Sequence, residues 1–344
     1  MVRLRFTEKL LHRLNLLPQP IFDAFLQPLL GRAVMVSHKL GLFERLLQRP
    51  QSAEDIAEEL RLSVEGVKLL LQVLDVAGYV RRSGDRFEAT AVTRKWLDRR
   101  SAHSIEDLVA YFETLFARWG YLDDTVRRGS PHRMYFELFT PEDWRVYTHG
   151  MMSLARLLMP QVLRHVRLAR EARRLLDIGG SHGLYSIELC RRYSELRAAV
   201  VEYSEVAVHG RRIVRDAGMA DRISYVEGDF LSVDLGSSYD AALAFNVIHG
   251  LTWKQSDLLA SRVYDVLRPG GTWFILDEFA LAKKSSFVGR LVPAVVGLHL
   301  FNETGGRTYK TEEVRRMCKG AGFSDISVAL LGTPGVAVLQ CVKR

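Results

Sequence analysis

The glycine-rich segment at residues 179–183 has the residue types and spacing that hold a nucleotide-type cofactor. It follows an apolar run that contains Asp177, and a helical pattern begins directly after it. Glycine has no Cβ atom, so such a turn can bend sharply and lie close to a ligand. A second apolar run ends at Glu202, whose carboxylate can accept both ribose hydroxyls of a nucleoside. The order of strand, glycine turn, helix, strand and acid predicts a cofactor site rather than an ordinary tight turn.

His249 is a second candidate for a catalytic role. It follows the apolar run at residues 239–245, which is predicted to be a strand. Ligands bind at the edge formed by the carboxyl ends of parallel strands, so we expect His249 at the same edge as the glycine-rich segment. An imidazole with an ordinary pKa of about 6.5 can take a proton from a hydroxyl group as that hydroxyl attacks. The alternative is a structural histidine that caps the next helix.

The elements that must position these residues alternate between strands and helices. Residues 255–267 and 311–320 are predicted to be helices. Such alternation is typical of an α/β fold with a parallel, doubly wound, Rossmann-like sheet. The short segment 332–335 predicts a hairpin between the last two strands, and therefore one antiparallel strand. The predicted strands are residues 174–178, 198–201, 223–226, 239–245, 272–277, 324–330 and 336–342.

The first hundred residues follow a different pattern. Ser52, with an acid three residues later, predicts the start of a helix over residues 53–60. Gly78 predicts the end of a second helix that begins after Ser63. A hairpin around residues 83–85 follows, so this order of elements predicts a winged helix.

The second helix of this module offers few groups that could read DNA. Lys68 and Gln72 are polar, whereas apolar residues occupy nearly every face. A DNA-reading helix presents basic and polar side chains to base edges, whereas an apolar helix needs burial on two sides. We therefore predict an all-helical or winged-helix dimerisation domain at residues 1–103, a homodimer and no nucleic-acid partner. A winged-helix DNA-binding regulator is the alternative. Residues 104–344 would form a helical cap and the Rossmann-like domain.

Composition limits the class of protein. The 344 residues are 48% hydrophobic, carry a formal net charge of +8 and include three well-separated cysteines without metal-ligand spacing. These values predict a soluble protein in a reducing cytoplasm, without a metal site. Basic residues interrupt the leucine-rich arm before Gly31, which argues against a signal peptide. We expect this arm to support a dimer, and contact with a membrane surface is the alternative.

Aromatic and methionine side chains are dense before the first strand of the large sheet. Most aromatic residues at helical spacing form core, but this position in the chain also suits a cap over a substrate cavity. Methionine adapts to irregular ligands. We predict a substrate pocket lined by Phe112, Phe116, Met152, Met159, His299 and Phe301.

Six blocks in order resemble the S-adenosylmethionine-dependent methyltransferases of the plant caffeate and hydroxyindole O-methyltransferase type, and most closely their bacterial members from secondary metabolism. The resemblance covers nearly the whole chain, from the winged helix to Val342. A dinucleotide site would favour a glycine at the position of Ser181, whereas S-adenosylmethionine has no phosphate to bind. The blocks are residues 176–183, Glu202, residues 227–230, 246–251 and 267–271, and residues 305–309 with 312–314.

This resemblance implies a Rossmann-like methyltransferase that uses S-adenosylmethionine and releases S-adenosylhomocysteine. It implies His249 as the general base that accepts the proton of a small, aromatic or polyketide-like hydroxyl acceptor. The glycine-rich segment would hold the methionine end of the cofactor, Glu202 the ribose, and Asp229 the adenine amino group. The implied cofactor-binding residues are Asp177, Gly179, Gly180, Ser181, Gly183, Glu202, Asp229, Phe230, Asn246 and Met151.

Two positions depart from the plant-type pattern around the histidine. Gly250 stands where an aspartate follows the histidine, and Thr308 where a glutamate orients its ring. A base without an orienting carboxylate is less basic and has a less fixed tautomer. Asp277, Glu278 or Glu303 could substitute. The departures leave open an unusually acidic acceptor hydroxyl, C- or N-methylation, or use of the cofactor for a different reaction.

Overall fold

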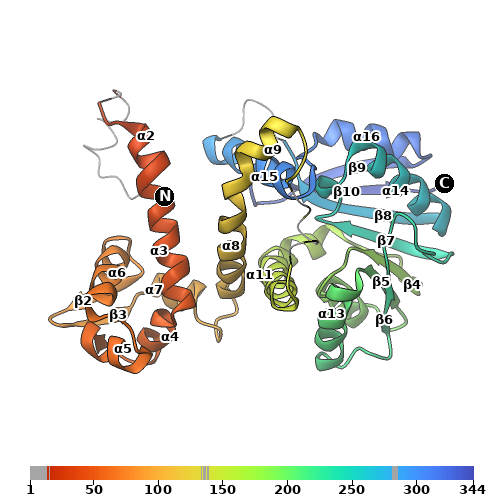
Figure 1. Cartoon of the computed structure of the whole chain (residues 1–344). Coiled ribbons are helices and arrows are strands. Elements are labelled where there is room, and N and C mark those ends of the chain that lie inside the picture. The colour runs from red at the N-terminus through yellow and green to blue at the C-terminus, as the bar shows by residue number, and fades with distance from the viewer. Residues whose placement is uncertain (1–13, 15, 133, 135–136, 138, 281–285) are drawn as a thin grey trace. The chain divides into compact units, whose positions relative to one another are not determined.

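The protein folds as two compact units, Met1–Ala117 and Arg118–Arg344. The structure is a computed structural model that describes residues 14, 16–132, 134, 137, 139–280 and 286–344 (Figure 1). Most of the basic N-terminal arm, at residues 1–13 and 15, lies outside the described residues, so its predicted role stays a prediction. The predicted domain boundary after residue 103 lies one helix earlier than the division after Ala117.

The first unit contains helices and a small antiparallel sheet with the strand order β1-β3-β2. The two predicted helices and the hairpin are present. The unit is not all-helical, because the two hairpin strands and β1 form a three-stranded sheet. The Ser52 hydroxyl accepts the Asp55 N–H at 3.0 Å, so a capping box starts α5. The elements are α2 (Gln19–Ile21), a π-helical turn (Phe22–Leu26), α3 (Gln27–Lys39), α4 (Leu42–Gln48), β1 (Gln51–Ser52), α5 (Ala53–Leu60), α6 (Val64–Val76), β2 (Val80–Ser83), β3 (Arg86–Ala89), α7 (Ala91–Trp96) and α8 (Glu106–Arg118).

Helix α6 is apolar on two faces, as its sequence predicts. Leu71 and Leu74 are fully buried in the core of the first unit. Leu69 is 54% exposed and Val76 92% exposed on the same helix. The outer apolar face therefore remains uncovered within the described chain.

The second unit is built on a seven-stranded sheet with the order β6-β5-β4-β7-β8-β10-β9. The five strands from β6 to β8 are parallel, and β10 is antiparallel to both β8 and β9, so the predicted hairpin is confirmed. β8 begins at Leu267 rather than at the predicted Thr272, because Leu267 already pairs with Tyr239. The strands are β4 (Arg174–Ile178), β5 (Arg197–Glu202), β6 (Ile223–Glu227), β7 (Tyr239–Phe245), β8 (Leu267–Glu278), β9 (Ser324–Leu330) and β10 (Val336–Val342).

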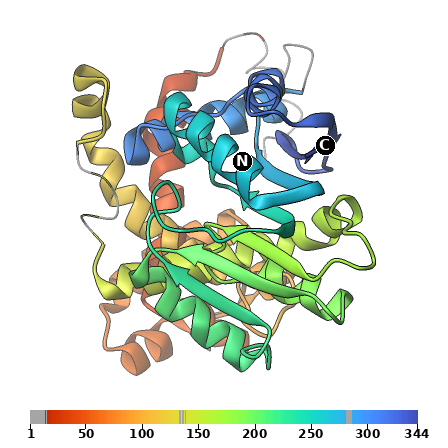
Figure 2. The same ribbon diagram turned by 90° about the vertical axis from the view of Figure 1, so that its right-hand side faces the viewer.

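Side chains of the large sheet alternate between two apolar cores. Trp273 and Ile275 lie in the core shared with α14 and α16, whereas Phe274 and Leu276 lie in the core shared with α11 and α12. Figures 1 and 2 show these helix groups on opposite faces of the sheet. Burial of both faces is what a parallel sheet needs. The helices are a 3₁₀ turn (Trp119–Tyr121), α9 (Leu122–Arg128), α11 (Pro141–His165), α12 (Leu184–Arg192), α13 (Ser204–Asp216), the 3₁₀ turn η3 (Ile248–Gly250), α14 (Trp253–Val266), α15 (Phe287–Thr304) and α16 (Thr311–Gly320).

The sheet topology brings the ends of several strands together. The chain leaves β4 toward β5 on one side and returns to β7 on the other, so the crevice at their carboxyl ends is a switch point of the kind that binds ligands. No helix among the described residues combines the length and apolar character that crossing a bilayer requires.

Candidate active site at the carboxyl edge of the sheet

The glycine-rich segment forms a tight loop between β4 and α12. Gly179, Ser181 and Gly183 have positive φ angles of 62°, 45° and 67°. Such angles strain a residue with a Cβ atom and cost glycine little, so Ser181 is the strained member of the loop. A Cβ on Gly180 would lie 2.6 Å from the carboxyl carbon of Asp177, which excludes any larger residue there.

Asp177 and Glu202 support this loop from within the protein. The Ser186 hydroxyl donates to Asp177 Oδ2 at 2.6 Å, and the Ser181 N–H donates to Glu202 Oε2 at 3.1 Å. Burial raises the pKa of Asp177 to about 6 and that of Glu202 to about 7. The structure therefore brings the predicted acid and the predicted turn into direct contact.

Two residues that the sequence did not identify also hold this loop in place. The Tyr225 hydroxyl donates to the Ser181 carbonyl at 2.9 Å. A Cβ on Gly210 of α13 would lie 2.2 Å from this hydroxyl and 2.3 Å from the same carbonyl. Gly210 therefore lets α13 pack against the loop. A glycine inside an amphipathic helical pattern was the signal that could have identified it.

His182 links the loop to α11. Its Nδ1 accepts the Leu184 N–H at 3.0 Å, and the ring also bonds to the backbone of Met151. Burial lowers the pKa of His182 to about 3, so its ring is neutral. Half-buried Met151, predicted to contact the cofactor, is thus brought to the loop through its backbone.

Asp229 and Phe230 lie just beyond the carboxyl end of β6. The Leu231 N–H donates to Asp229 Oδ1 at 2.9 Å, which fixes this carboxylate at the start of a turn. Phe230 is half-buried against the core shared with α14. Both predicted residues therefore stand at the same edge as the glycine-rich loop.

The polar atoms at this edge fit S-adenosylmethionine. The side-chain oxygens of Ser181, Tyr185 and Asn246 are buried and have no hydrogen-bond partner within the described part of the chain. Asn246 has a φ of 56° at the end of β7, and Tyr185 packs edge-on against Phe245 at 4.7 Å. A buried polar atom without a partner is costly, so these oxygens suit a polar ligand. The glycine loop beside them leaves room for its backbone to approach that ligand.

His249 lies at the same edge, in the turn η3 after β7. Its Nδ1 bonds to Asp277 Oδ1 and lies 3.4 Å from Glu278 Oε2. Its backbone N–H donates to Asp277 Oδ2 at 3.1 Å, so one carboxylate orients both the ring and the main chain. Two of the three carboxylates considered from the sequence thus surround the ring. The third, Glu303, pairs with Arg118 at 2.7 Å instead.

The carboxylates decide the charge of His249. Burial acts to lower the pKa of its ring, but Asp277 and Glu278 outweigh burial and raise the pKa to about 10. Burial likewise opposes ionisation of Glu278, but the bond with His249 holds the pKa of that carboxyl below its usual range. At neutral pH the ring therefore carries a proton on both nitrogens.

The two positions that depart from the plant-type pattern take no part in orienting His249. The Thr308 hydroxyl donates to the Pro293 carbonyl at 3.2 Å. Near Gly250, the later glycine block packs against the main chain of the histidine: the Arg307 N–H donates to the His249 carbonyl at 2.9 Å. A Cβ on Gly306 would lie 2.0 Å from that carbonyl. This block therefore positions the backbone of His249 and leaves the ring to Asp277.

The same three side chains have the dimensions of a metal site. Ligand atoms of His249, Asp277 and Glu278 all lie within 4.8 Å of one another. Both carboxylates contact Nδ1, which binds a cation only after losing its proton. A protonated ring between two carboxylates already satisfies all three groups, so the geometry supports an ion pair.

The predicted pocket residues separate into three groups. His299 and Phe301 are half-buried on α15, and the His299 ring stacks on Trp119 with centroids 6.2 Å apart. On α11, Met152 is buried, and Met159 lies in the core with Leu158, which is the environment of a packing residue. The last pair, Phe112 and Phe116, is exposed on α8 in the first unit, where its predicted role stays a prediction.

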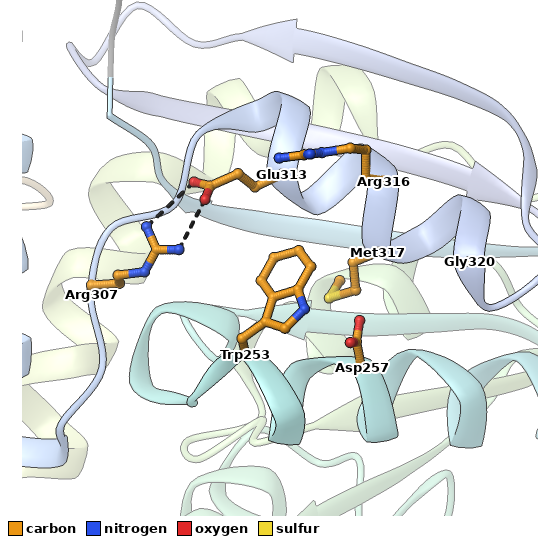
Figure 3. A pocket seen from close by; sticks show the side chains of 7 residues that line it. All are labelled: Trp253, Asp257, Arg307, Glu313, Arg316, Met317 and Gly320. Atoms are coloured by element: carbon orange, nitrogen blue, oxygen red, sulfur yellow. Dashed lines mark hydrogen bonds and ion pairs between the residues drawn. The ribbon is translucent and has the colours of Figure 1, made fainter.

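A separate cavity of about 570 Å³ lies between α14 and α16 (Figure 3). Trp253 stands beside Met317 in it, and Arg307 pairs with Glu313 at 2.9 Å at one end. None of the predicted site residues lines this cavity; its lining residues are Trp253, Asp257, Arg307, Glu313, Arg316, Met317 and Gly320.

Comparison with known proteins shows the family of this chain. Residues 119–324 match the O-methyltransferase domain family. The chain is 28% identical to a 3-hydroxy-5-methyl-1-naphthoate 3-O-methyltransferase of Streptomyces sahachiroi, over 86% of each chain. It is 27% identical to the aclacinomycin 10-hydroxylase RdmB of Streptomyces purpurascens, over 85% of this chain and 80% of the relative. Human N-acetylserotonin methyltransferase, solved with S-adenosylmethionine, shares the fold with a TM-score of 0.84 at 19% identity, over 94% of this chain and 97% of the other. The chain belongs to the O-methyltransferase family, whose members use S-adenosylmethionine.

Proposed function

We propose that this enzyme methylates the hydroxyl group of a small aromatic or polyketide-like acceptor. His249 would share the hydroxyl proton and stabilise the ionised oxygen. The pairing of His249 with Asp277 at the sheet edge, beside the glycine-rich loop, carries this proposal. S-adenosylmethionine supplies an electrophilic methyl group, so the protein needs mainly to align the acceptor and remove a proton.

Each group of cofactor-binding residues would contact a different part of S-adenosylmethionine. Glu202, held by the Ser181 N–H, would accept the ribose hydroxyls, and Asp229 would bind the adenine amino group. The free oxygens of Ser181, Tyr185 and Asn246 would meet the polar methionine end. We assign Asp177 a bracing role, since the Ser186 hydroxyl already occupies its Oδ2.

The raised pKa of His249 favours an aromatic hydroxyl over an aliphatic one. A phenol has a pKa of about 10, close to that of this imidazolium, so a proton is readily shared between them. The acceptor oxygen then attacks as a phenolate beside the protonated ring, and its proton leaves to the solvent. Asp277 and Glu278 stabilise the imidazolium throughout.

Two measurements test the proposed activity. Calorimetry should show binding of S-adenosylhomocysteine, and labelled S-adenosylmethionine should transfer its methyl group to 3-hydroxy-1-naphthoate or N-acetylserotonin. A matched aromatic amine should remain unlabelled. Absence of cofactor binding would end the proposal, and labelling of the amine alone would replace O- with N-methylation.

The similarity to RdmB makes hydroxylation the second candidate reaction, because that relative is named a hydroxylase. Mass spectrometry of the product separates the two reactions. A methylated product with equimolar S-adenosylhomocysteine supports methyl transfer. An oxygenated product with unconsumed S-adenosylmethionine supports hydroxylation.

We also infer a homodimer formed through the first unit. The outer face of α6 exposes Leu69, Val73 and Val76, and its Lys68 is paired with Glu54 at 2.6 Å. An apolar face of this kind suits a second copy of the chain better than nucleic acid. Sedimentation should give a dimer that the variant Leu69→Glu/Val76→Glu converts to a monomer. A monomer at all concentrations, or a salt-dependent shift of DNA mobility, would refute the dimer assignment.

A further inference from the structure

A second buried polar cluster lies where α15 passes Arg118, the last residue of α8, and the next residue Trp119. Arg118 pairs with Glu303 at 2.7 Å, and the side chains of the two residues are only 10% and 6% exposed. The Trp119 indole N–H donates to His299 Nδ1 at 3.3 Å, with the two rings nearly parallel at 12°. Asn302 completes the cluster, because its amide donates to the Arg118 carbonyl at 3.3 Å. Three positions on one face of α15 thus hold the end of α8 and its next residue.

Two donors of this cluster have no acceptor among the described residues, where the buried Asn302 Oδ1 also lacks a donor. Arg118 Nη1 is buried and bonds to nothing in the described ranges, although the residue is only 9% exposed. Trp119 donates to His299 Nδ1, which places the ring proton on Nε2. Burial lowers the pKa of His299 to about 4, so the ring stays neutral and Nε2 remains a donor. A buried guanidinium N–H without a partner is costly, and its retention indicates a ligand oxygen.

This cluster stands beside the catalytic histidine. Helix α15 contacts the turn η3 that carries His249. The Thr304 hydroxyl lies 4.0 Å from the point that a Cβ on Gly250 would occupy. The charge of His249 also contributes to the low pKa of His299, after the larger effect of burial. An acceptor placed with its hydroxyl at His249 can therefore extend toward α15.

We propose that the acceptor is an aromatic hydroxyl compound that also bears a carboxylate or ketone oxygen, which Arg118 Nη1 and His299 Nε2 bind. This assignment rests on the proposed methyl transfer and specifies its substrate class. Glu303 holds the guanidinium through Nη2, and Phe139 lies under it at 5.0 Å, so the free N–H is fixed in direction. Hydrogen bonds from a guanidinium to a carboxylate are among the stronger ones in proteins, so the carboxylate is the preferred form.

Binding to protein saturated with S-adenosylhomocysteine tests the proposal without methyl transfer. The probes are 3-hydroxy-1-naphthoate, its methyl ester and 2-naphthol, which share one ring system and one hydroxyl position. We expect calorimetry to show the acid binding at least about tenfold more tightly than 2-naphthol. The ester distinguishes a carbonyl from a charged oxygen. An affinity for the ester that lies between the affinities for the acid and for 2-naphthol indicates that both charge and carbonyl contribute. Equal affinities for acid and 2-naphthol would overturn the proposal.

Variants show whether these two donors cause the preference. Arg118→Met/Glu303→Gln removes both charges and so avoids a stranded buried carboxylate. We expect the preference for the acid to fall to within about twofold, with 2-naphthol binding unchanged. His299→Phe keeps a ring against Trp119 and should lose part of the preference. Arg191→Met/Glu188→Gln, at a surface pair of α12, is the control and should keep all of it.

The outcomes separate this inference from the proposed function. A preference that survives in both site variants would refute the role of Arg118 and His299, even where methyl transfer proceeds. Selective binding of the acid without any methyl transfer would support the oxygen-binding site and refute the proposed reaction. Should the double variant fail to fold, the wild-type comparison and His299→Phe still decide the question.

Discussion

The two halves of the sheet's carboxyl edge treat buried charge in opposite ways. In the β4–β5 half, Asp177 and Glu202 accept hydrogen bonds from neutral donors. Neither forms an ion pair with a cation of the described chain, and burial raises both pKa values. In the β7–β8 half, Asp277 and Glu278 surround the cationic ring of His249, and the pKa of that ring rises instead.

This contrast teaches what each half needs. A buried carboxylate without a cation is unfavourable until a positive partner arrives. The proposed methyl donor carries a sulfonium and an ammonium group, so the first half is matched to a cationic ligand. The second half already contains its own cation and is arranged to hold a proton. We therefore expect changes in the first half to affect cofactor binding and changes in the second half to affect turnover.

The largest expected effect comes from removing the charged ring that faces the acceptor hydroxyl. His249→Ala should lower kcat by about 10²-fold or more and leave S-adenosylhomocysteine affinity unchanged, because the ring touches only the β7–β8 half. Single-turnover kinetics and calorimetry measure the two quantities. His165→Ala, at the exposed end of α11, is the control. Loss of cofactor affinity in His249→Ala would erase the distinction between the halves.

Gly210→Ala should weaken cofactor binding, in contrast to His249→Ala, which should lower kcat. Its Cβ would lie 2.3 Å from the Ser181 carbonyl, so either the loop or α13 must move. We expect cofactor affinity to fall by about 10²-fold, since a backbone contact of this length cannot be relieved by a side chain. Gly320→Ala has no atom within 4 Å of the new Cβ and serves as the control. Wild-type affinity in Gly210→Ala would show that the loop does not depend on α13.

Asp277→Asn should sharpen the comparison within the second half. The amide cannot stabilise the imidazolium as a carboxylate does, so we expect kcat to fall by about 10- to 100-fold. The pKa of His249 should fall as well, so the pH above which the ring loses its proton and kcat/KM declines should also fall. A pH–rate profile measures this shift. An unchanged profile with reduced kcat would assign Asp277 a structural role only.

Stability should depend on pH in two separate windows. Glu202 has a pKa raised from 4.5 to about 7, so its contribution to cofactor-free stability is complete below about pH 4.5 and is lost as pH rises through 7. The pKa of His249 is raised from 6.5 to about 10, so its contribution is complete below about pH 6.5 and is lost as pH rises through 10. Each contribution is on the order of a few kcal/mol.

Thermal melts of two variants locate these windows. Glu202→Gln should reduce the lower window and leave the part that Asp177 contributes through its pKa of about 6, and His249→Gln should reduce the upper window only. Flattening of the same window by both variants would mean that the two halves titrate together.

The smallest expected effect is that of a chelator. We expect EDTA to leave methyl transfer unchanged, because a protonated His249 ring lies between the two carboxylates of the only metal-sized cluster among the described residues. Activity with and without added divalent cations provides the measurement. Loss of activity that added metal restores would turn this ion pair into a metal centre.

Much of the first half could be predicted from the chain because its signals are local. The glycines at residues 179–183 need backbone angles that few other residues adopt, and Glu202 follows the next strand directly. The capping box at Ser52 and the strand at residues 239–245 are equally local. Such features depend on backbone conformation and side-chain periodicity, which neighbouring residues determine.

The second half could be predicted only in outline. His249 was identifiable, but three carboxylates were equal candidates for its partner. Asp277 became that partner because β8 pairs with β7 and brings residues 28 positions apart into contact. Thr308, at the position where the plant-type pattern has the orienting glutamate, bonds to Pro293 instead. Strand order and register made these choices, and no local pattern encodes them.

The residues alone therefore specify a Rossmann-like sheet, a glycine loop with its acid, and a histidine at the same edge. Folding specifies which charges meet. Tyr225 supports the loop from 44 positions beyond Ser181, Gly210 does so from the next helix but one, and Trp119 meets His299 across 180 positions. A side chain's partner depends on how distant elements pack, whereas the turn that holds a ligand depends on the backbone freedom of consecutive residues.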